Sequence, residues 1–307
     1  MAAQTRGTFS ALYDNVEKMI IFITDDKLRE LPEIYSDIFA IKSSTKKFER
    51  SQSVVPFGDV PQKDEGDVYA FDLIRPGYQR DVTHVEFGLG FEFTETADED
   101  DEFDVLAKKA ELLAYVARVT QEKQAAAIFN NGFSTQTTPD GLSLFNTAHV
   151  LKGGGTAKNR PTSDADLTIT SLAQAFIDMQ TDTKDEAGHL LAPITSVKLH
   201  VPPALEFIAE RLVSSAGLPG SSDNDINAVK KRRRIDIVVN PYLTDTDAWF
   251  LVAADKNAHG FLSYKRIPPK MAPMMQDAYT GNKIAKIRFR QSWDAILWQG
   301  SYGTAGA

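Results

Sequence analysis

The amino-acid sequence predicts an α+β fold, because long strand patterns and long helix patterns both occur and no internal repeat is visible. The segment HVEFGLGFEF at 84–93 alternates apolar and polar residues, which is the period of two of a half-buried strand. Apolar residues then recur at helical spacing over 103–129. Between about 166 and 264, strand and helix patterns take turns, as they do in compact α+β units.

Length and composition limit the classes of protein. The chain has 307 residues, 42% hydrophobic and 25% charged, so it can bury one elaborated core or two moderate ones. It contains no cysteine, which excludes disulfides, thiolate metal ligands and cysteine catalysis. The net charge of −8 argues against a general nucleic-acid coat. Neither the start MAAQTRGTFS nor the short apolar run MIIFI fits a signal peptide or a membrane span, so we expect no membrane attachment.

Residues 1 to 53 have the features of an arm rather than of a domain. A helix is predicted from the cap region at Thr24 to Leu31, and the polar stretch SSTKKFERSQS follows. This segment has too few apolar residues for a core of its own, so we expect it to lie against another part of the molecule or another subunit.

A hairpin is predicted next. Gly66 and a turn at Arg75–Gly77 separate VYAFDLI, at 68–74, from the ribbon HVEFGLGFEF, and we expect these two stretches to pair. At about 3.3 Å per residue the ribbon is roughly 33 Å long. The acidic residues 98–104 follow at the expected positive end of a helix about 40 Å long.

Two helices and several strands are predicted in the C-terminal half. Thr170 is expected to cap a helix whose apolar stripe reaches Met179, and a second helix starts after Pro202 and Pro203. The strand patterns are TSVKLHV, RIDIVV, AWFLVAA and FLSYK. The final extended stretch alternates apolar and basic residues, with one face made of Ala285, Ile287 and Phe289 and the other of Lys286, Arg288 and Arg290.

No motif predicts a catalytic, cofactor-binding or metal site. The five histidines lack ligand spacing, and His149 in LFNTAHV is favoured as a structural histidine. The glycine-rich LKGGGTAKN at 151–159 lacks the GK[ST] ending of a phosphate loop, and no GxSxG motif occurs. We interpret the basic run Lys230–Arg234 as a solvated or subunit-facing patch, and DEDDE at 98–102 as a helix start rather than a metal cluster.

The order of several motifs is more specific than any one of them. DGLSLFNTAH follows the long helix, VPPAL precedes a later helix, and NPYLTDTDAWFL and the ending WQGSYG come after them. In this order, over about residues 20 to 305, the chain resembles the major capsid proteins of tailed bacteriophages, the Mu-like major head subunits among them.

The resemblance implies a Hong Kong 97 type of capsid fold and a structural, non-enzymatic role without a cofactor. Copies of the chain would form pentamers and hexamers of an icosahedral shell around double-stranded DNA, assembled in the host cytoplasm and found in the virion. Scaffold, portal and decoration proteins are the implied partners, with the scaffold either a separate protein or a segment already removed. The implied regions are an N-arm at 1–53, an E-loop at 54–96, a P-domain with a spine helix at 97–165 and 265–307, and an A-domain at 166–264.

The ribbon supplies the predicted subunit interface. Its apolar face needs cover that the hairpin alone does not provide, so we expect it to lie across a neighbouring subunit. The predicted contact residues are Val85, Phe87, Leu89, Phe91 and Phe93.

Two other functions stay open. An encapsulin-like nanocompartment shell protein would share the fold and differ in its cargo. A soluble hydrolase would use Asp140 or His149, and would need a partner within hydrogen-bond reach and a pocket.

Overall fold

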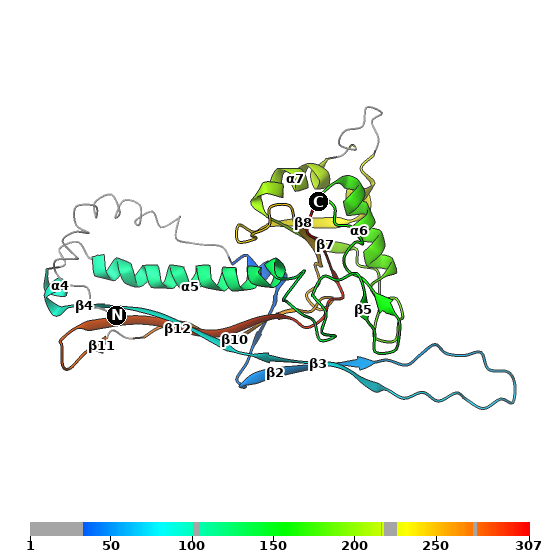
Figure 1. Cartoon of the computed structure of the whole chain (residues 1–307), viewed down its shortest axis with the longest axis horizontal. Coiled ribbons are helices and arrows are strands. Elements are labelled where there is room, and N and C mark those ends of the chain that lie inside the picture. Colours follow the sequence, from blue (N-terminus) through cyan, green and yellow to red (C-terminus); the bar gives the residue numbers. More distant parts are fainter. Residues whose placement is uncertain (1–32, 101–104, 216, 218–225, 273–274) are drawn as a thin grey trace.

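The structure is a computed structural model, and it describes residues 33–100, 105–215, 217, 226–272 and 275–307. The molecule is elongated. A long sheet with one helix along it forms one end, a second lobe stands beside the other end of that sheet, and a hairpin projects past the second lobe (Figure 1). The helix predicted from Thr24 to Leu31 lies outside the described residues.

The long sheet consists of strands from distant parts of the sequence. Its strands are β1 (Ala40–Ser43), β4 (Val85–Phe93), β10 (Phe261–Met271), β11 (Met275–Gln276) and β12 (Lys283–Ala295). The central strand β12 runs antiparallel to β10 on one side and to β4 on the other, and β1 joins β10 in parallel. Among the described strands, β4 is therefore an edge strand.

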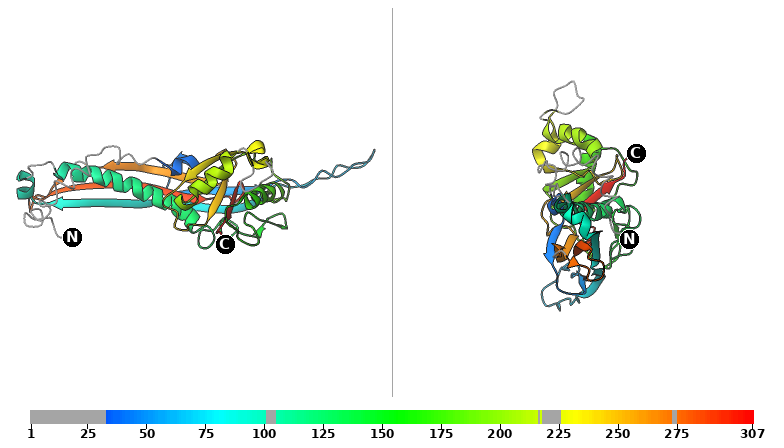
Figure 2. Two further views of the ribbon diagram at one scale, coloured as in Figure 1. Left: turned by 90° about the horizontal axis from the view of Figure 1, so that it is seen from above. Right: turned by 90° about the vertical axis from the view of Figure 1, so that its left-hand side faces the viewer.

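The long helix α5 (Val105–Asn130) packs along one face of this sheet (Figure 2). Its 26 residues span about 39 Å at 1.5 Å per residue, close to the predicted length. Leu113 and Ala117 of α5 contact the apolar face of β12 that the sequence predicted. The buried members of that face are Ala285, Ile287 and Phe289. The alternation in β12 therefore separates a helix-covered face from a basic face.

The predicted hairpin pairing is wrong. The segment VYAFDLI at 68–74 forms no strand, and the ribbon pairs with β12 instead, with Phe87 opposite Phe289. The hairpin that does form joins β2 (Phe48–Val55) to β3 (Arg75–Thr83). The ribbon pairs with β12 because both strands carry alternating apolar residues that α5 can cover, whereas 68–74 extends away from any core.

The second lobe contains a four-stranded sheet with three helices. The sheet order is β13 (Ser301–Thr304), β9 (Trp249–Ala253), β7 (Ser196–Val201) and β8 (Arg234–Val239), and the helices are α6 (Ile169–Thr181), α7 (Glu206–Ser214) and α8 (Ala228–Arg232). The short 3-10 turn η1 (Pro203–Leu205) leads into α7, as Pro202 and Pro203 predicted. Helix α6 is capped by Thr168 rather than by Thr170, because Thr168 and Ser171 bond reciprocally in a capping box.

The final strand differs from the predicted division. The sequence placed all of 265–307 with the long helix, yet β13 pairs with β9 inside the second lobe. The strand FLSYK, expected in that lobe, begins β10 of the long sheet. A core of aromatic side chains at the junction joins the two parts: Phe129 of α5 stacks on Phe261 at 4.9 Å and lies 5.1 Å from Phe250 of β9.

The remaining elements are short. They are α3 (Tyr35–Ile38), α4 (Glu95–Glu99), β5 (His149–Val150) and β6 (Thr156–Ala157). The strands β5 and β6 enclose the glycine-rich turn, where Gly154 and Gly155 have positive φ, so this stretch is a tight turn. Within the described part of the chain, no helix is long and apolar enough to cross a membrane.

Candidate functional site

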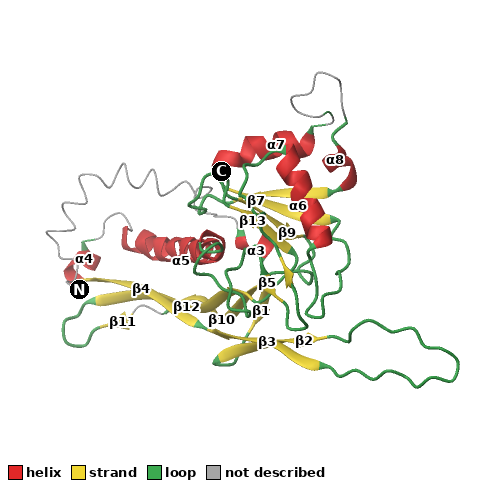
Figure 3. Ribbon diagram, turned by 45° about the vertical axis from the view of Figure 1, so that its right-hand side comes forward, coloured by secondary structure: helices red, strands yellow, loops and turns green. Residues whose placement is uncertain are grey.

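A group of strongly exposed apolar side chains lies at the end of the β2–β3 hairpin. We call residues 56–74 the hairpin tip; Figure 3 shows it as a long loop beyond the two strands. Val60 is 96% exposed and Phe71 is 95% exposed. The exposed large apolar residues of the tip are Phe57, Val60, Val68, Tyr69, Phe71, Leu73 and Ile74. Exposed apolar residues gathered on one segment indicate a binding surface for another macromolecule.

The base of the hairpin is fixed to the body by a partly buried ion pair. Arg80 of β3 donates through Nε and Nη2 to the two carboxylate oxygens of Asp294 in β12, at 2.8 and 3.0 Å. Asp294 is almost fully buried and also accepts from Gln136 at 2.8 Å. A two-point contact between guanidinium and carboxylate fixes direction as well as distance. The base of the hairpin is therefore held rigidly while its tip extends into solvent.

A second contact fixes the other side of the hairpin base. The Tyr78 hydroxyl donates to the Val150 carbonyl oxygen at 3.1 Å, and Lys152 Nζ lies 4.4 Å from the centre of the Tyr78 ring. A cavity of about 120 Å³ separates this part of the hairpin from the body, with Asp140 and Glu186 in its wall. The hairpin thus meets the body through discrete polar contacts around a small cavity.

The five predicted contact residues occupy different environments in β4. Phe93 is fully buried, and Phe87 and Phe91 pack against the cluster that α5 forms with β12, where the Phe87 and Phe289 rings stack at 4.9 Å. Val85 and Leu89 are 52% and 50% exposed. The three phenylalanines therefore contribute to the chain's own core, while Val85 and Leu89 remain available at the sheet edge. Their assignment to a subunit interface stays a prediction.

The sequence does not predict the tip as an exposed surface, because VYAFDLI has the residue types of a strand that pairs with the ribbon. The signal that could have identified it is the charge between its apolar residues, since acids at 59, 64, 65, 67 and 72 flank them and would oppose burial in a core.

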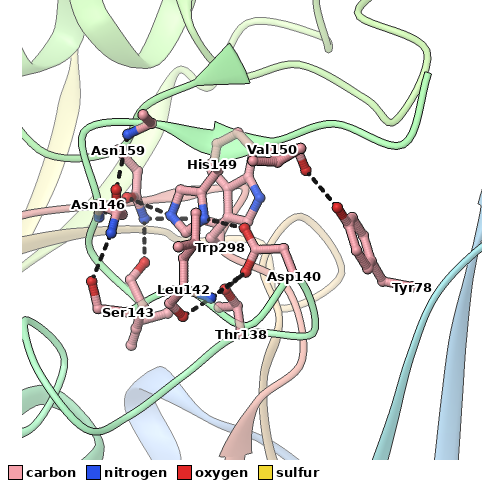
Figure 4. A network of polar contacts seen from close by, with 12 residues as sticks. Tyr78, Thr138, Asp140, Leu142, Ser143, Asn146, His149, Val150, Asn159 and Trp298 are labelled. Carbon is pink, nitrogen blue, oxygen red and sulfur yellow. Dashed lines mark hydrogen bonds and ion pairs between the residues drawn. The ribbon is translucent and has the colours of Figure 1, made fainter. Parts of the chain in front are cut away.

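Asp140 and His149, the two alternative candidates for a hydrolase, form a closed structural network (Figure 4). His149 Nδ1 lies 2.6 Å from Asp140 Oδ2, and Nε2 lies 3.1 Å from Asn159 Oδ1. The imidazole is fully buried and stacks on Trp298 with ring centres 4.6 Å apart. Asn159 Nδ2 donates to the Leu144 carbonyl, so its oxygen faces the histidine.

This network holds the loop around Asp140 and His149 in place, and it leaves neither ring nitrogen of His149 free to contact a substrate. Both His149 nitrogens are occupied by side-chain oxygens, those of Asp140 and Asn159. Burial alone would raise the pKa of Asp140, but hydrogen bonds from His149 and Thr138 outweigh it and hold the pKa below its usual value. A general base needs a free lone pair beside the substrate, so the geometry does not support the hydrolase hypothesis.

The other polar motifs form no site in the part of the chain that the structure describes, and the end of DEDDE, from 101 onward, lies outside that part. Lys230, Lys231 and Arg232 are exposed on α8, as expected of a solvated patch. Over the residues that the structure describes, no group of three or more histidine and carboxylate side chains could hold a metal ion.

Comparisons with known structures agree in fold at very low sequence identity. The capsid of the Cyanophage P-SCSP1u is 12% identical over 89% of this chain and 88% of that one, with a TM-score of 0.61. A structure from Mycobacterium phage Patience is 8% identical over 99% of this chain and 92% of that one, with a TM-score of 0.59. The holo-SrpI encapsulin complex from Synechococcus elongatus PCC 7942 is 10% identical over 90% and 88%, with a TM-score of 0.52. The chain thus has the α+β fold of Hong Kong 97 type capsid proteins.

Comparisons with sequences identify the family. No curated protein sequence matches the chain. The model of a family described as phage capsid protein matches residues 77–307, which include β4, α5, the second lobe and both long strands of the sheet. The chain belongs to this phage capsid protein family, and it is a major capsid protein of the tailed-phage type.

Proposed function

We propose that copies of this chain associate into pentamers and hexamers of an icosahedral shell that encloses double-stranded DNA, and that the hairpin tip makes the contact between neighbouring copies. Membership of the capsid family supports self-association. Scaffold, portal and decoration proteins are proposed partners, and assembly in the host cytoplasm is the proposed route to the virion.

The observation that carries this proposal is the tip itself. It exposes seven large apolar side chains on a segment that extends beyond its base, so burial against another molecule removes a large apolar area from water. A hairpin that reaches past its own body gains this cover from a second copy. We therefore propose Phe48–Thr83 as the E-loop, in place of 54–96, and keep Val85 and Leu89 as further candidate contacts at the sheet edge.

The test is electron microscopy of the purified full chain together with a tip variant. We expect closed particles from the natural chain. Val68→Asp with Phe71→Asp places two charges among the tip's apolar side chains, so particles should be lost while cooperative unfolding is retained. A matched control, Gln62→Asp with Lys63→Gln, makes the tip equally more negative without removing any large apolar side chain, and should assemble.

Two outcomes contradict the proposal. A natural chain that stays monomeric at high concentration, with and without co-expressed phage proteins, rules out the shell. Normal particles from the Val68 and Phe71 variant rule out the tip as the subunit contact.

A nanocompartment shell is the second candidate, because an encapsulin complex is among the similar structures. It differs in contents rather than in architecture. Purified particles that contain a co-purifying protein and no nucleic acid would favour it over a phage head.

A further inference from the structure

We propose that the cavity beside Asp140 binds one divalent cation, with Ca²⁺ as the best fit, through carboxylate oxygens of Asp140 and Glu186 and the amide oxygen of Gln299. We call these three residues the cation site. They come from three loops of the body, and the cavity that they line has a volume of about 120 Å³. The inference goes beyond shell formation, because the site lies within one chain and can be measured on dispersed copies.

Gln299 provides the observation that points to a ligand. The residue is 8% exposed, and its amide nitrogen donates to the Lys184 carbonyl oxygen at 3.3 Å. Its Oε1 is buried and accepts no hydrogen bond from any described residue. A buried acceptor without a donor is unfavourable, and coordination to a cation removes that penalty.

Asp140 keeps one acceptor position for a ligand. Its side chain is 2% exposed. Oδ1 accepts from the Thr138 hydroxyl and the Leu142 amide, whereas Oδ2 contacts only His149 Nδ1. A carboxylate oxygen can accept twice, so Oδ2 retains one acceptor position. Figure 4 shows Asp140 on the side of this network that faces Tyr78, another residue of the cavity wall.

Glu186 is the second buried carboxylate of the cavity. It is 8% exposed, and Oε2 accepts from the Lys152 amide at 3.0 Å. Burial raises the pKa of Glu186, the bond from the Lys152 amide lowers it, and the negative charge of Asp140 raises it again. Two acids that oppose each other's ionisation in one small cavity are both stabilised by a cation bound between them.

No lysine or arginine within the described ranges forms an ion pair with either carboxylate. The Lys152 ammonium acts on Glu186 only from a distance, because its Nζ lies 4.4 Å from the centre of the Tyr78 ring and outside ion-pair distance of both acids. The negative charge in the cavity wall is therefore available to a bound ion.

The glycine-rich turn between β5 and β6 holds Glu186 in place. The Gly153 amide donates to the Glu186 carbonyl oxygen at 2.7 Å, next to the bond from Lys152 to the side chain. A Cβ at position 153 would lie 2.6 Å from that carbonyl oxygen, so glycine is needed for this close approach. The motif LKGGGTAKN, which lacks the ending of a phosphate loop, thus positions a carboxylate.

The ligand atoms and the space favour Ca²⁺. All three ligands are oxygens, and Ca²⁺ takes about six to eight oxygens from carboxylates, amides and water in flexible geometry, whereas Mg²⁺ requires a near-ideal octahedron. A single water needs at least roughly 10–15 Å³, so 120 Å³ accommodates the ion and several waters. Two carboxylates and an amide also differ from the clusters of three acidic or histidine side chains that the described chain lacks.

Terbium luminescence tests the site on the full chain after treatment with a chelator. Tb³⁺ replaces Ca²⁺ at oxygen ligands and emits light when a neighbouring tryptophan transfers energy to it, and Trp298 lines the cavity. We expect emission that saturates at one Tb³⁺ per chain. Ca²⁺ should displace Tb³⁺ and should also raise the melting temperature of the chain, because the ion binds only the folded state.

Two substitutions should change the affinity in opposite directions. Glu186→Gln removes a charge and should weaken Ca²⁺ binding by at least about tenfold. Gln299→Glu adds a third carboxylate and should strengthen Ca²⁺ binding by at least about tenfold. Glu65→Gln removes an exposed carboxylate outside the cavity, so this matched control should bind as the natural chain does.

Three results would overturn the cation site. They are a natural chain without saturable Tb³⁺ emission, an affinity that Glu186→Gln leaves unchanged, and displacement of Tb³⁺ by Mg²⁺ at lower concentration than by Ca²⁺. If Glu186→Gln fails to fold, Gln299→Glu decides, because an affinity that does not rise contradicts the site. None of these measurements involves particles, so a failed cation site leaves the proposed shell standing, and a chain that forms no shell can still bind Ca²⁺.

Discussion

Glu122 is a buried acid whose charge state should control how strongly the segment around Tyr35 is held against α5. Its side chain is almost fully buried, and Oε2 accepts from the Tyr35 amide at 3.1 Å. Oε1 has no hydrogen-bond partner among the described residues. Burial raises the pKa of Glu122 to about 7, although Tyr35 and Arg118 act in the opposite direction.

The sign of the pH effect follows from this raised pKa. The folded chain binds the proton more tightly than the unfolded chain, whose glutamate has a pKa near 4.5. The stability contributed by protonated Glu122 is fully present below pH 4.5 and is lost as the pH rises through 7. A difference of about 2.5 pKa units corresponds to roughly 3 kcal/mol, of which about 2.5 kcal/mol falls between pH 5 and 8.5.

Glu122→Gln should remove this dependence, because glutamine keeps an acceptor for the Tyr35 amide and cannot ionise. Urea unfolding of dispersed chain at pH 5 and 8.5, followed by tryptophan fluorescence, measures it, since Trp293 lies 6.1 Å from Tyr35. The exposed Glu65→Gln is the control and should leave the pH dependence unchanged. If the free energy of unfolding falls equally between pH 5 and 8.5 in the natural chain and in Glu122→Gln, the assignment of this pH dependence to Glu122 is refuted.

Three further predictions follow from burial. Phe87→Ala removes a ring stacked on Phe289 and should lower the free energy of unfolding by about 3 kcal/mol. Phe71→Ala at the exposed tip should change the free energy of unfolding by less than about 0.5 kcal/mol. Urea titration of the two variants measures both changes. His200 is fully buried, and burial lowers its pKa to about 3. The stability contributed by the neutral imidazole should be fully present above pH 6.5, and the free energy of unfolding should fall by about 4 kcal/mol as the pH drops toward 3. Thermal melting of His200→Phe should not show this loss. Asp140→Asn removes the buried carboxylate that His149 Nδ1 contacts at 2.6 Å and should lower the melting temperature by several degrees, while a retained melting temperature would contradict a structural role for this contact.

The sequence predicted elements better than it predicted their partners. The stripe of α5 and the alternation of β12 appear as expected, because each pattern reports which side of an element is covered. The alternation in the ribbon 85–93 predicts that one face is buried, but it does not identify the element that buries this face. In the structure, α5 and β12 pack against Phe87 and Phe91, which the sequence predicted to contact a second subunit. The family resemblance correctly indicated the capsid fold before any strand pairing was known.

The candidate site was harder to predict, because exposure depends on the absence of a partner. VYAFDLI has the residue types of a strand, yet the hairpin directs it beyond the body. The basic alternation at 286–290 is visible in the sequence, whereas its position beside Gly88 and Gly90 depends on the strand register.

The pairing of β4 with β12 has a consequence for how the chain is synthesised. Phe93 pairs with Lys283, which follows it by 190 positions (283 − 93). A ribosome that adds roughly 5–20 residues per second makes β12 about 10–40 s after β4. During this interval the apolar strand has no backbone partner, and pairing across so long a loop is slow in any case. The nascent chain therefore exposes β4 to other nascent copies before the sheet can close, and low temperature or bound chaperones during expression should increase the yield of folded protein.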